Sequence, residues 1–295
     1  MPTLLTCTDG SAYAASLYQH TAWAAARLGA RVEVLHVYPS AAPFLFPPVN
    51  FMGDPSMGSA SLALPELTAL SEAQEREARA AALALLDLAA TALREAGLPE
   101  CRLTALDGNL PEVLRTWEGP VDLLLLGKRG ESSAAALQDL GSQLETVIRH
   151  SPHPVLVVSH QFRPIRRFLI SFDDSPASHA ALHHVVDSPL LRGLPCSLLM
   201  VGEPSEANQA ALDSARTFLQ SGGFAPEEFL LQGDPETVST WEIAAQHIDL
   251  LVMGAYSHSR FLQFFIGSTT NEIIRRCRVP VLVMGGRMPH QHPAD

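Results

Sequence analysis

The strongest constraint on the fold of this chain is an internal repeat. Residues Val121–Gly127 match Ile248–Gly254, and Pro154–Val158 match Pro280–Met284. Two further pairs of similar segments lie in the same order along the chain: Thr8–Ser11 with Phe172–Ser175, and Leu106–Glu112 with Leu231–Glu236. Four ordered matches indicate two copies of one structural unit. We therefore expect a first domain of residues 1–160, a second domain of residues 166–287 and a tail of residues 288–295.

Short apolar segments alternate with helical segments in each copy. The apolar segments are continuous, which is typical of parallel strands covered on both faces, and their alternation with helices predicts right-handed βαβ units. The predicted fold class is therefore α/β, with two tandem copies of a doubly wound, five-stranded parallel-sheet domain. The expected strands are Thr3–Thr8, Arg31–Tyr38, Arg102–Leu106, Leu123–Leu126 and Pro154–Val158, then Phe168–Phe172, Ser197–Val201, Phe229–Leu231, Leu250–Met253 and Val281–Met284.

Helices are expected between the strands. One long insert makes the first copy longer than the second. Gly29 and Gly97 are plausible C-caps for the first two helices. The insert, Pro39–Leu64, is rich in Pro, Gly and Ser, and its Phe and Met residues favour packing against a surface, a neighbouring domain or a second subunit. The expected helices are Ala12–Leu28, Pro65–Ala96, Pro176–Val186, Ser205–Gln220 and Thr237–His247.

Composition excludes several classes of protein. The hydrophobic fraction of 47% excludes a chain that is disordered throughout, and the net charge of −11 without a basic stripe argues against binding to duplex nucleic acid. No apolar run reaches the roughly 18 residues that a membrane span needs. No C-x-x-C pair is present, so reduced thiols are expected. We therefore expect a cytoplasmic protein with neither nucleic-acid nor membrane partners.

Residues with useful chemistry lie where the parallel strands end. Asp9 and Asp173 follow the first strand of each copy, and Gly127 and Gly254 end the fourth. Ligands bind at the carboxyl ends of such strands, where the strand order reverses. A helix N-terminus suits phosphate, and a carboxylate can accept hydrogen bonds from ribose hydroxyls or an adenine amino group. The pattern therefore indicates a nucleotide pocket, with a Gly-Ser pair opening the next helix of each copy: Gly141-Ser142 and Gly267-Ser268.

These motifs resemble those of the universal stress protein family. The resemblance rests on the pattern Gly-x2-Gly-x9-Gly-Ser/Thr, on the early Asp and on the final Pro-Val-Leu-Val strand, and it covers nearly the whole chain as a tandem. It implies a Rossmann-like, HUP-type fold, an adenine-nucleotide site in many members, and a role as a stress-response sensor or switch. It also implies pairing of the last strands, here Val155–Val158 with Val281–Met284, as an intramolecular pseudo-dimer. The insert would then allow a homodimer.

Neither copy fits the family motif completely. The first has Gly127 and Gly130 but ten residues, not nine, before Gly141, whereas the second keeps nine residues but has Ser257 in place of a glycine. We therefore expect ATP or a related adenine nucleotide, with or without Mg2+, in the second copy. The predicted site residues are Asp173, Gly254, Ser257, His258, Arg260, Gly267, Ser268 and Thr269, and those of a second candidate site are Asp9, Gly127, Gly130, Gly141 and Ser142.

Structural explanations stay open for the same residues. Asp9 and Asp173 could N-cap helices, Gly127 and Gly254 could be turn glycines, and Lys128 with Arg129 could be a solvated pair. The Gly-Ser pairs could serve only to start helices, because two capping-box patterns are present: Ser142-x-x-Glu145 and Thr269-x-x-Glu272.

Catalytic and metal-binding alternatives have less support. P-loop, dinucleotide-fingerprint and nucleophile-elbow motifs are all missing, so no catalytic residue is predicted and slow ATP hydrolysis is the most that we expect. No metal is predicted at His183-His184, because adjacent helix residues point to different faces, nor at the tail pair His290-x-His292. Two rival functions remain: a nucleotide-free interaction module that dimerises through its edge strands, and a weak ATPase.

Overall fold

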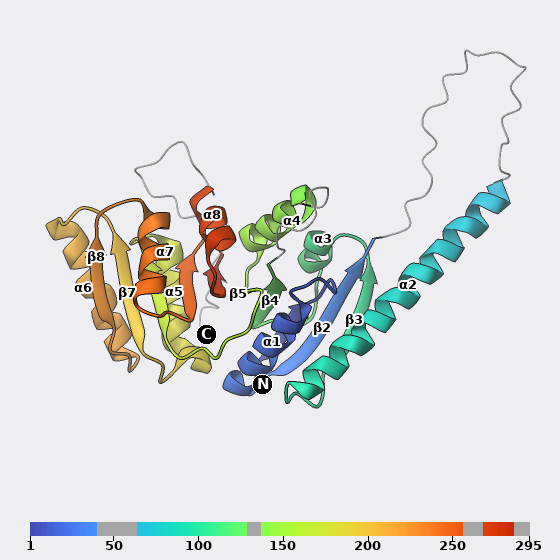
Figure 1. The fold of residues 1–295 in the computed structure, drawn as a ribbon, viewed down its shortest axis with the longest axis horizontal. Helices are drawn as coiled ribbons and strands as arrows, with labels where there is room; N and C mark the ends of the chain where they lie inside the picture. Colours follow the sequence, from blue (N-terminus) through green and yellow to red (C-terminus); the bar gives the residue numbers. More distant parts are fainter. Residues whose placement is uncertain (40–63, 129–136, 256–267, 286–295) are drawn as a thin grey trace, which may run out of the picture.

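The computed structural model of this chain describes residues 1–39, 64–128, 137–255 and 268–285 (Figure 1). The strands are β1 (Thr3–Cys7), β2 (Arg31–Tyr38), β3 (Arg102–Asp107), β4 (Leu123–Gly127), β5 (Val155–Val158), β6 (Phe168–Phe172), β7 (Cys196–Val201), β8 (Glu227–Leu231), β9 (Leu250–Gly254) and β10 (Val281–Met284). The helices are α1 (Ala14–Leu28), α2 (Leu64–Glu95), α3 (Leu110–Arg115), α4 (Leu137–His150), α5 (Pro176–Asp187), the 3-10 helix η1 (Pro189–Leu191), α6 (Glu206–Ser221), α7 (Pro235–Ala245) and α8 (Ser268–Arg276).

The ten strands of the described residues belong to one sheet, in the order β3-β2-β1-β4-β5-β10-β9-β6-β7-β8. Pairing is parallel within each half and antiparallel only where β5 meets β10, with Leu282 opposite Leu156. Each half therefore has the doubly wound order that the sequence predicts, and the α/β prediction is confirmed. In each half the strand order reverses between the first and the fourth strand, which are β1 and β4, or β6 and β9.

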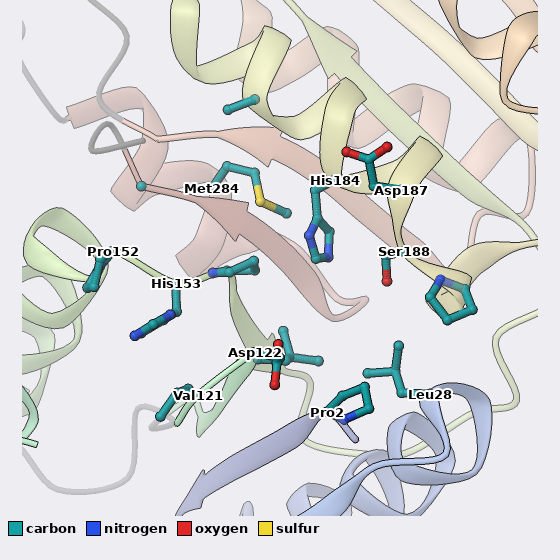
Figure 2. A pocket seen from close by; sticks show the side chains of 15 residues that line it. Pro2, Leu28, Val121, Asp122, Pro152, His153, His184, Asp187, Ser188 and Met284 are labelled. Carbon is teal, nitrogen blue, oxygen red and sulfur yellow. The ribbon is translucent and has the colours of Figure 1, made fainter. Parts of the chain in front are cut away.

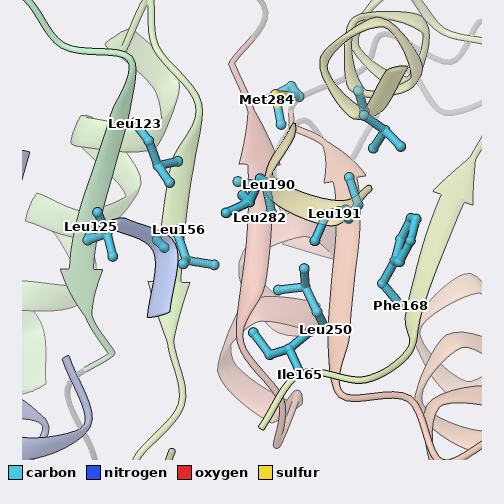
Figure 3. Close-up of a cluster of buried hydrophobic side chains, with 14 of the residues drawn as sticks. Leu123, Leu125, Leu156, Ile165, Phe168, Leu190, Leu191, Leu250, Leu282 and Met284 are labelled. Atoms are coloured by element: carbon cyan, nitrogen blue, oxygen red, sulfur yellow. The ribbon is translucent and has the colours of Figure 1, made fainter. Parts of the chain in front are cut away.

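Helices cover both faces of the sheet, and two apolar clusters lie beneath them. Residues of α1, α2, α5 and α6 contribute to one cluster, and residues of α4, α7 and α8 contribute to the other. Successive strand residues alternate between the clusters, as Leu123 and Leu124 do, because side chains alternate along a strand. The first cluster runs without interruption from Leu125 in one half to Phe168 in the other, so the two halves share a core (Figure 3).

Burial explains why the central strands read as continuous apolar runs while the edge strands do not. All residues of β5 and β10 are buried, whereas no residue of β3 or β8, the two edge strands, is fully buried. The sequence prediction of β10 agrees with the observed bounds, and β8 begins two residues earlier than predicted. Edge strands have neighbours on one side only, so their sequences carry a weaker apolar signal.

An aspartate in front of the fourth strand anchors the first strand of each half. The carboxylate of Asp122 accepts a hydrogen bond from the Thr3 N–H at 2.7 Å. The carboxylate of Asp249 accepts from the N–H groups of Arg166 and Arg167, at 2.9 and 3.2 Å. These two aspartates belong to the clearest repeat segment of the sequence. Part of that match is therefore explained by the need to hydrogen-bond backbone N–H groups where the first strand of each half begins.

Two helices differ from the sequence prediction. Helix α3 was not predicted, because six residues are too few to show a helical period. Helix α4 (Leu137–His150) already includes the residues before Gly141, whereas the motif predicts that the Gly141-Ser142 pair opens it. That expectation is wrong for the first copy. Leu, Gln and Asp in the preceding turn are compatible with a helix, so the helix continues towards its N-terminus past Gly141.

Two histidines at corresponding places in α1 and α5 are held neutral by burial. Burial lowers the pKa of His20 and of His184 from 6.5 to about 4. His20 has no exposed surface, and its Nδ1 lies 2.8 Å from the carbonyl oxygen of Ser16. Because the unfolded chain takes up these protons at a higher pH than the folded chain does, acid favours unfolding.

We expect the free energy of unfolding to fall as the pH drops from 6.5 to 4. Each histidine contributes at most about 1.4 kcal/mol per pH unit to this slope. Urea unfolding at several pH values would measure it. The variants His20→Asn and His184→Asn, which cannot titrate, should have a shallower slope than the unmodified chain. An unchanged slope in both variants would show that carboxylates alone cause the acid sensitivity.

Candidate functional site

The strand order reverses at one point in each half. The predicted aspartate and glycine of each copy lie at that point, at the carboxyl ends of two neighbouring strands. In the second half, β6 pairs with β9, and Ser171 lies opposite Met253. Asp173 and Gly254 follow at the carboxyl ends of these two strands. In the first half, Cys7 lies opposite Leu126, so Asp9 and Gly127 have the corresponding position. The structure therefore brings together the described residue pair of each candidate site.

Asp173 orients the turn between β6 and α5 but does not cap the helix. Its Oδ1 accepts hydrogen bonds from the backbone N–H of Ser175 at 3.2 Å and from the Ser175 hydroxyl at 2.5 Å. Ser175 is the N-cap residue of α5, and its Oγ accepts from the N–H of Ser178 at 3.2 Å. The N-cap alternative for Asp173 is therefore wrong, because the serine takes that role and the aspartate positions the serine.

The residue after each aspartate adopts the left-handed conformation that glycine favours. Gly10 has φ of +69°, and Asp174 has φ of +59°. The Asp174 carboxylate lies 2.8 Å from the Nε2 of His179, one turn into α5. In the first copy, the Asp9 carboxylate accepts a hydrogen bond from the N–H of Ser11 at 2.9 Å. The side chain of the N-cap residue of α1 forms no capping hydrogen bond. A non-glycine residue in this conformation is strained, and Asp tolerates it better than most.

Close packing requires glycine at position 254 and, to a smaller degree, favours it at position 127, whereas a turn explains neither. Neither belongs to the glycines with positive φ. A Cβ on Gly254 would lie 2.5 Å from the Ala177 carbonyl carbon and 2.6 Å from the Ser178 nitrogen, both in the first turn of α5. A Cβ on Gly127 would meet the Cβ of Tyr13 at 3.1 Å. The turn-glycine alternative is therefore wrong, and the approach of the helix to the strand explains Gly254.

The Gly-Ser pairs of the two copies lie differently with respect to the helices that follow the fourth strands. The described part of α8 starts with Ser268, and Gly267 lies outside the described residues, so the predicted helix start at the second pair stays a prediction. In the first copy, Gly141 and Ser142 lie inside α4, and the capping box of Ser142 with Glu145 is wrong. Glu145 instead forms an ion pair with Arg149 at 2.5 Å, one turn further along the same helix. The first copy therefore does not place its Gly-Ser pair at a helix N-terminus.

Several predicted residues lie outside the described part of the chain. This holds for Ser257, His258, Arg260 and Gly267 of the preferred site and for Gly130 of the second candidate site. Ser268 and Thr269 are placed in α8, but their side chains are not described. The same limit applies to Arg129, to the insert from residue 40 to residue 63, and to the tail histidines His290 and His292.

Lys128 has a role that the sequence did not indicate. Its ammonium group donates a hydrogen bond to the carbonyl oxygen of Cys277 at 3.0 Å, just after the C-terminal end of α8. Burial lowers the pKa of Lys128 from 10.5 to about 8. A cation at this place complements the negative end of the α8 dipole. The expectation of a solvated Lys128 is wrong: the side chain joins the two halves of the molecule.

The described residues offer no prepared metal site and no membrane-spanning helix. Within the described ranges, no three His, Cys, Asp or Glu side chains cluster as metal ligands would. His183 packs against Phe218 with ring centroids 4.5 Å apart, and its neighbour His184 faces elsewhere. No helix in this part of the chain is long and apolar enough to cross a membrane.

Comparison with known proteins decides the family. The family model described as the universal stress protein family matches residues 1–159 and 203–285. The chain belongs to the universal stress protein family. The universal stress protein Slr1230 of Synechocystis sp. PCC 6803 is 34% identical over 284 residues, which cover 96% of this chain and 99% of that relative.

Solved structures support the same fold for this universal stress protein. A universal stress protein from Archaeoglobus fulgidus DSM 4304 superposes with a TM-score of 0.63 and 18% identity, and the match covers 96% of each chain. A putative universal stress protein from Pseudomonas aeruginosa UCBPP-PA14 gives a TM-score of 0.59 and 15% identity, over 97% of this chain and 93% of that one. At these identities the likeness establishes the fold alone.

Proposed function

We propose that this universal stress protein binds ATP or a related adenine nucleotide in its second copy and acts as a stress-linked sensor or switch. The observation that carries the proposal is the difference between α4 and α8. Helix α4 already includes the residues from Leu137 onwards, ahead of Gly141, whereas the described part of α8 starts with Ser268, the residue after the predicted phosphate-loop residue Gly267. The first N–H groups of a helix have no intrahelical partner and suit phosphate oxygens. The second copy is therefore the better candidate.

The residues of this copy have distinct roles in the proposal. Asp173, at the end of β6, accepts hydrogen bonds from the nucleoside end of the ligand. The N-terminus of α8 binds the phosphates, with Ser268 and Thr269 as hydroxyl donors. Gly254 has a packing role, as its close approach to α5 requires. Ser257, His258 and Arg260 remain predicted phosphate contacts.

Mg2+ has no assigned role in this proposal. The carboxylates of Asp173 and Asp174 are engaged with Ser175 and His179, respectively. Two carboxylates that are turned to different protein partners do not form a prepared cation clamp. Asp173 and Asp174 are therefore not arranged to hold Mg2+ together.

The pairing of β5 with β10 supports a second part of the proposal. We propose that the copies, with the boundaries expected from the sequence, form an intramolecular pseudo-dimer. The antiparallel register of Val155 with Val283 and of Val157 with Val281 supports it. Arg27 in α1 adds a contact between the halves by donating from Nε to the carbonyl oxygen of Leu190 at 2.9 Å. The four free cysteines support the further proposal of a cytoplasmic location.

Calorimetric titration with ATP tests the nucleotide site. The variant Asp173→Ala should weaken ATP binding by about tenfold, equivalent to the loss of one charge-assisted hydrogen bond. Asp9→Ala, the matched change in the first copy, should leave the affinity within about twofold. Thermal melting of each variant separates lost binding from lost folding, because Asp173 also positions Ser175.

Two outcomes of this titration would contradict the proposal. Loss of binding in Asp9→Ala alone would move the site to the first copy. No heat of binding in the unmodified chain, together with no nucleotide in mass spectra of the purified protein, would favour the nucleotide-free interaction module.

A further inference from the structure

A cavity of about 420 Å3 lies between the two halves of the molecule (Figure 2). Gly285, the last described residue, is part of its wall, and residues 286–295, which we call the C-terminal segment, follow it. None of the residues that line the cavity belongs to either predicted nucleotide site. The C-terminal segment therefore starts at the wall of a cavity that the nucleotide proposal does not use.

The wall of this cavity is mostly apolar. Both halves contribute apolar side chains to it: Pro2, Leu28 and Val121 from the first half, and Ala180, Pro189 and Met284 from the second. The space has the volume of about 14 water molecules, and water in an apolar cavity lacks the polar partners that hold it in place. Covering the wall with an apolar side chain is therefore favourable.

The backbone at Gly285 is held tightly against the first half. A Cβ on Gly285 would lie 2.5 Å from the carbonyl oxygen of Ser151, just after the end of α4. The preceding residue is fixed as well, because the Met284 carbonyl oxygen accepts a hydrogen bond from the Ala255 N–H at 2.8 Å. A chain advances by at most about 3.6 Å per residue, so Met288 is no more than roughly 11 Å from Gly285. The C-terminal segment therefore begins at a fixed place, with Met288 in reach of the cavity.

The internal repeat provides a counterpart of this arrangement in the first half. His20 and His184 stand at the same distance along the chain from Asp9 and Asp173, in the equivalent helices α1 and α5. Both have a buried Nε2 without a hydrogen-bond partner in the described part of the chain. The group that covers His20 therefore predicts the kind of group that covers His184.

The segment that follows β5 covers His20. Its Phe162 packs edge-on against the His20 ring, with centroids 4.8 Å apart and an interplanar angle of 86°. The same segment is fastened to α1, because the Ser16 hydroxyl donates to the carbonyl oxygen of Ser159 at 2.7 Å. In the first half, the chain thus returns from its last strand to the histidine of its first helix.

The residue that corresponds to Phe162 in the second half is Met288. It is the fourth residue after β10, which ends at Met284, just as Phe162 is the fourth residue after β5. A proline follows closely in both segments, at Pro164 and Pro289. Methionine is apolar and flexible, and its sulfur makes favourable contacts with ring edges. Met288 therefore suits an irregular apolar space beside a ring.

His184 offers such a side chain a suitable surface. Its ring extends from α5 into the space between the two halves (Figure 2). Burial lowers the pKa of His184 from 6.5 to about 4, so the ring carries no charge near pH 7 that an apolar neighbour would desolvate. The second half lacks the serine fastening of the first, because Ala180 and Gly285 stand at the positions of Ser16 and Ser159. Contact in this half therefore depends on side-chain packing.

We propose that the C-terminal segment fills this cavity and that its Met288 side chain packs on His184. The contact is the counterpart of the packing of Phe162 on His20. Because the first half builds part of the wall, the C-terminal segment covers apolar surface of both halves and strengthens the junction made by β5 and β10. The proposal does not depend on nucleotide binding.

NMR of the full chain with 13C-methyl-labelled methionine tests the contact. The methyl signal of Met288, assigned with the variant Met288→Leu, should show a nuclear Overhauser effect to the ring protons of His184. In His184→Leu the same methyl signal should change its chemical shift, because the ring current is lost. His183→Leu is the matched control and should leave the signal unchanged, because that ring packs on Phe218.

Thermal melting tests whether the contact strengthens the junction. Met288→Asp and deletion of the C-terminal segment should each lower the melting temperature by about 2 °C or more, because the apolar wall is then exposed to water. Met288→Leu keeps an apolar side chain of similar size and should melt within about 1 °C of the unmodified chain. Ala294→Asp adds the same charge elsewhere in the segment and should also melt within about 1 °C.

Four results would overturn the proposal. The first is the absence of a nuclear Overhauser effect between Met288 and His184 in the folded full chain. The second is an unchanged melting temperature in both Met288→Asp and the shortened chain. The third is an effect that appears only between a labelled and an unlabelled chain, since the occupant would then be the C-terminal segment of a second copy. The fourth is a co-purifying small molecule, detected by mass spectrometry, whose removal changes the His184 signals, since that molecule would then be the occupant.

Discussion

Replacing Leu282 with alanine is expected to lower the free energy of unfolding by about 2–5 kcal/mol. Leu282 lies in β10 with no exposed surface, and its partner across the antiparallel junction is Leu156 of β5, which is equally buried. Both side chains belong to the apolar cluster that runs through the two halves (Figure 3). Removing either one leaves a cavity at the place where the halves are joined. Urea unfolding, followed by circular dichroism, measures the loss.

A double-mutant cycle makes this test specific for the junction. Leu156→Ala should cost a similar amount, and the double variant should cost less than the sum by about 0.5 kcal/mol or more, because the two side chains are neighbours. Leu88→Ala is the control: this residue of α2 is 72% exposed, so its removal should change stability by no more than about 0.5 kcal/mol. Strictly additive losses would show that Leu156 and Leu282 are buried by their own halves alone.

Replacing Gly254 with alanine is expected to destabilise the chain by about 1–3 kcal/mol, even though only one methyl group is added. The new Cβ would lie 2.5 Å from the Ala177 carbonyl carbon and 2.6 Å from the Ser178 nitrogen. Both are backbone atoms of α5 and cannot turn aside as a flexible side chain can. The helix must therefore shift away from β9. This shift would also move its N-cap residue Ser175, which is hydrogen-bonded to Asp173. Thermal and urea unfolding measure the effect.

Gly127→Ala is the matched control for Gly254→Ala. In the first copy the added Cβ meets the Cβ of Tyr13 at 3.1 Å, which requires a shift of only a few tenths of an ångström. The loss of stability should therefore be clearly smaller than for Gly254→Ala. Equal losses would mean that the glycines act through backbone entropy rather than through helix packing. A loss confined to ATP affinity, with unchanged stability, would assign Gly254 to the ligand instead.

Much of the fold could be predicted because the signal is local. The residues of β10 are four consecutive buried apolar residues, and the long helix α2 ends before Gly97 as its sequence predicts. The repeat then required both halves to share one topology. The extension of α4 past Gly141 towards its N-terminus was missed because it depends on which turn of a helix is stabilised in three dimensions, and neither Gly141 nor Ser142 carries that information.

The candidate site was predictable only as a set of positions. That Asp9 and Asp173 lie at strand ends followed from the strand pattern. What each residue does depends on its neighbours: Ser175 caps α5, Asp173 holds Ser175, and Lys128 reaches the end of α8 in the other half. Contacts between distant segments leave no periodic trace in a sequence, so these roles could not be read from it.

By itself the sequence determined the repeat, the parallel α/β class and the family, because apolar periodicity and glycine spacing are local properties of a chain. Only the tertiary structure decided the antiparallel register in which β5 and β10 join the copies, and that Gly254 serves helix packing. Each of these depends on which surfaces meet after folding, and that is settled by packing between residues far apart in the chain.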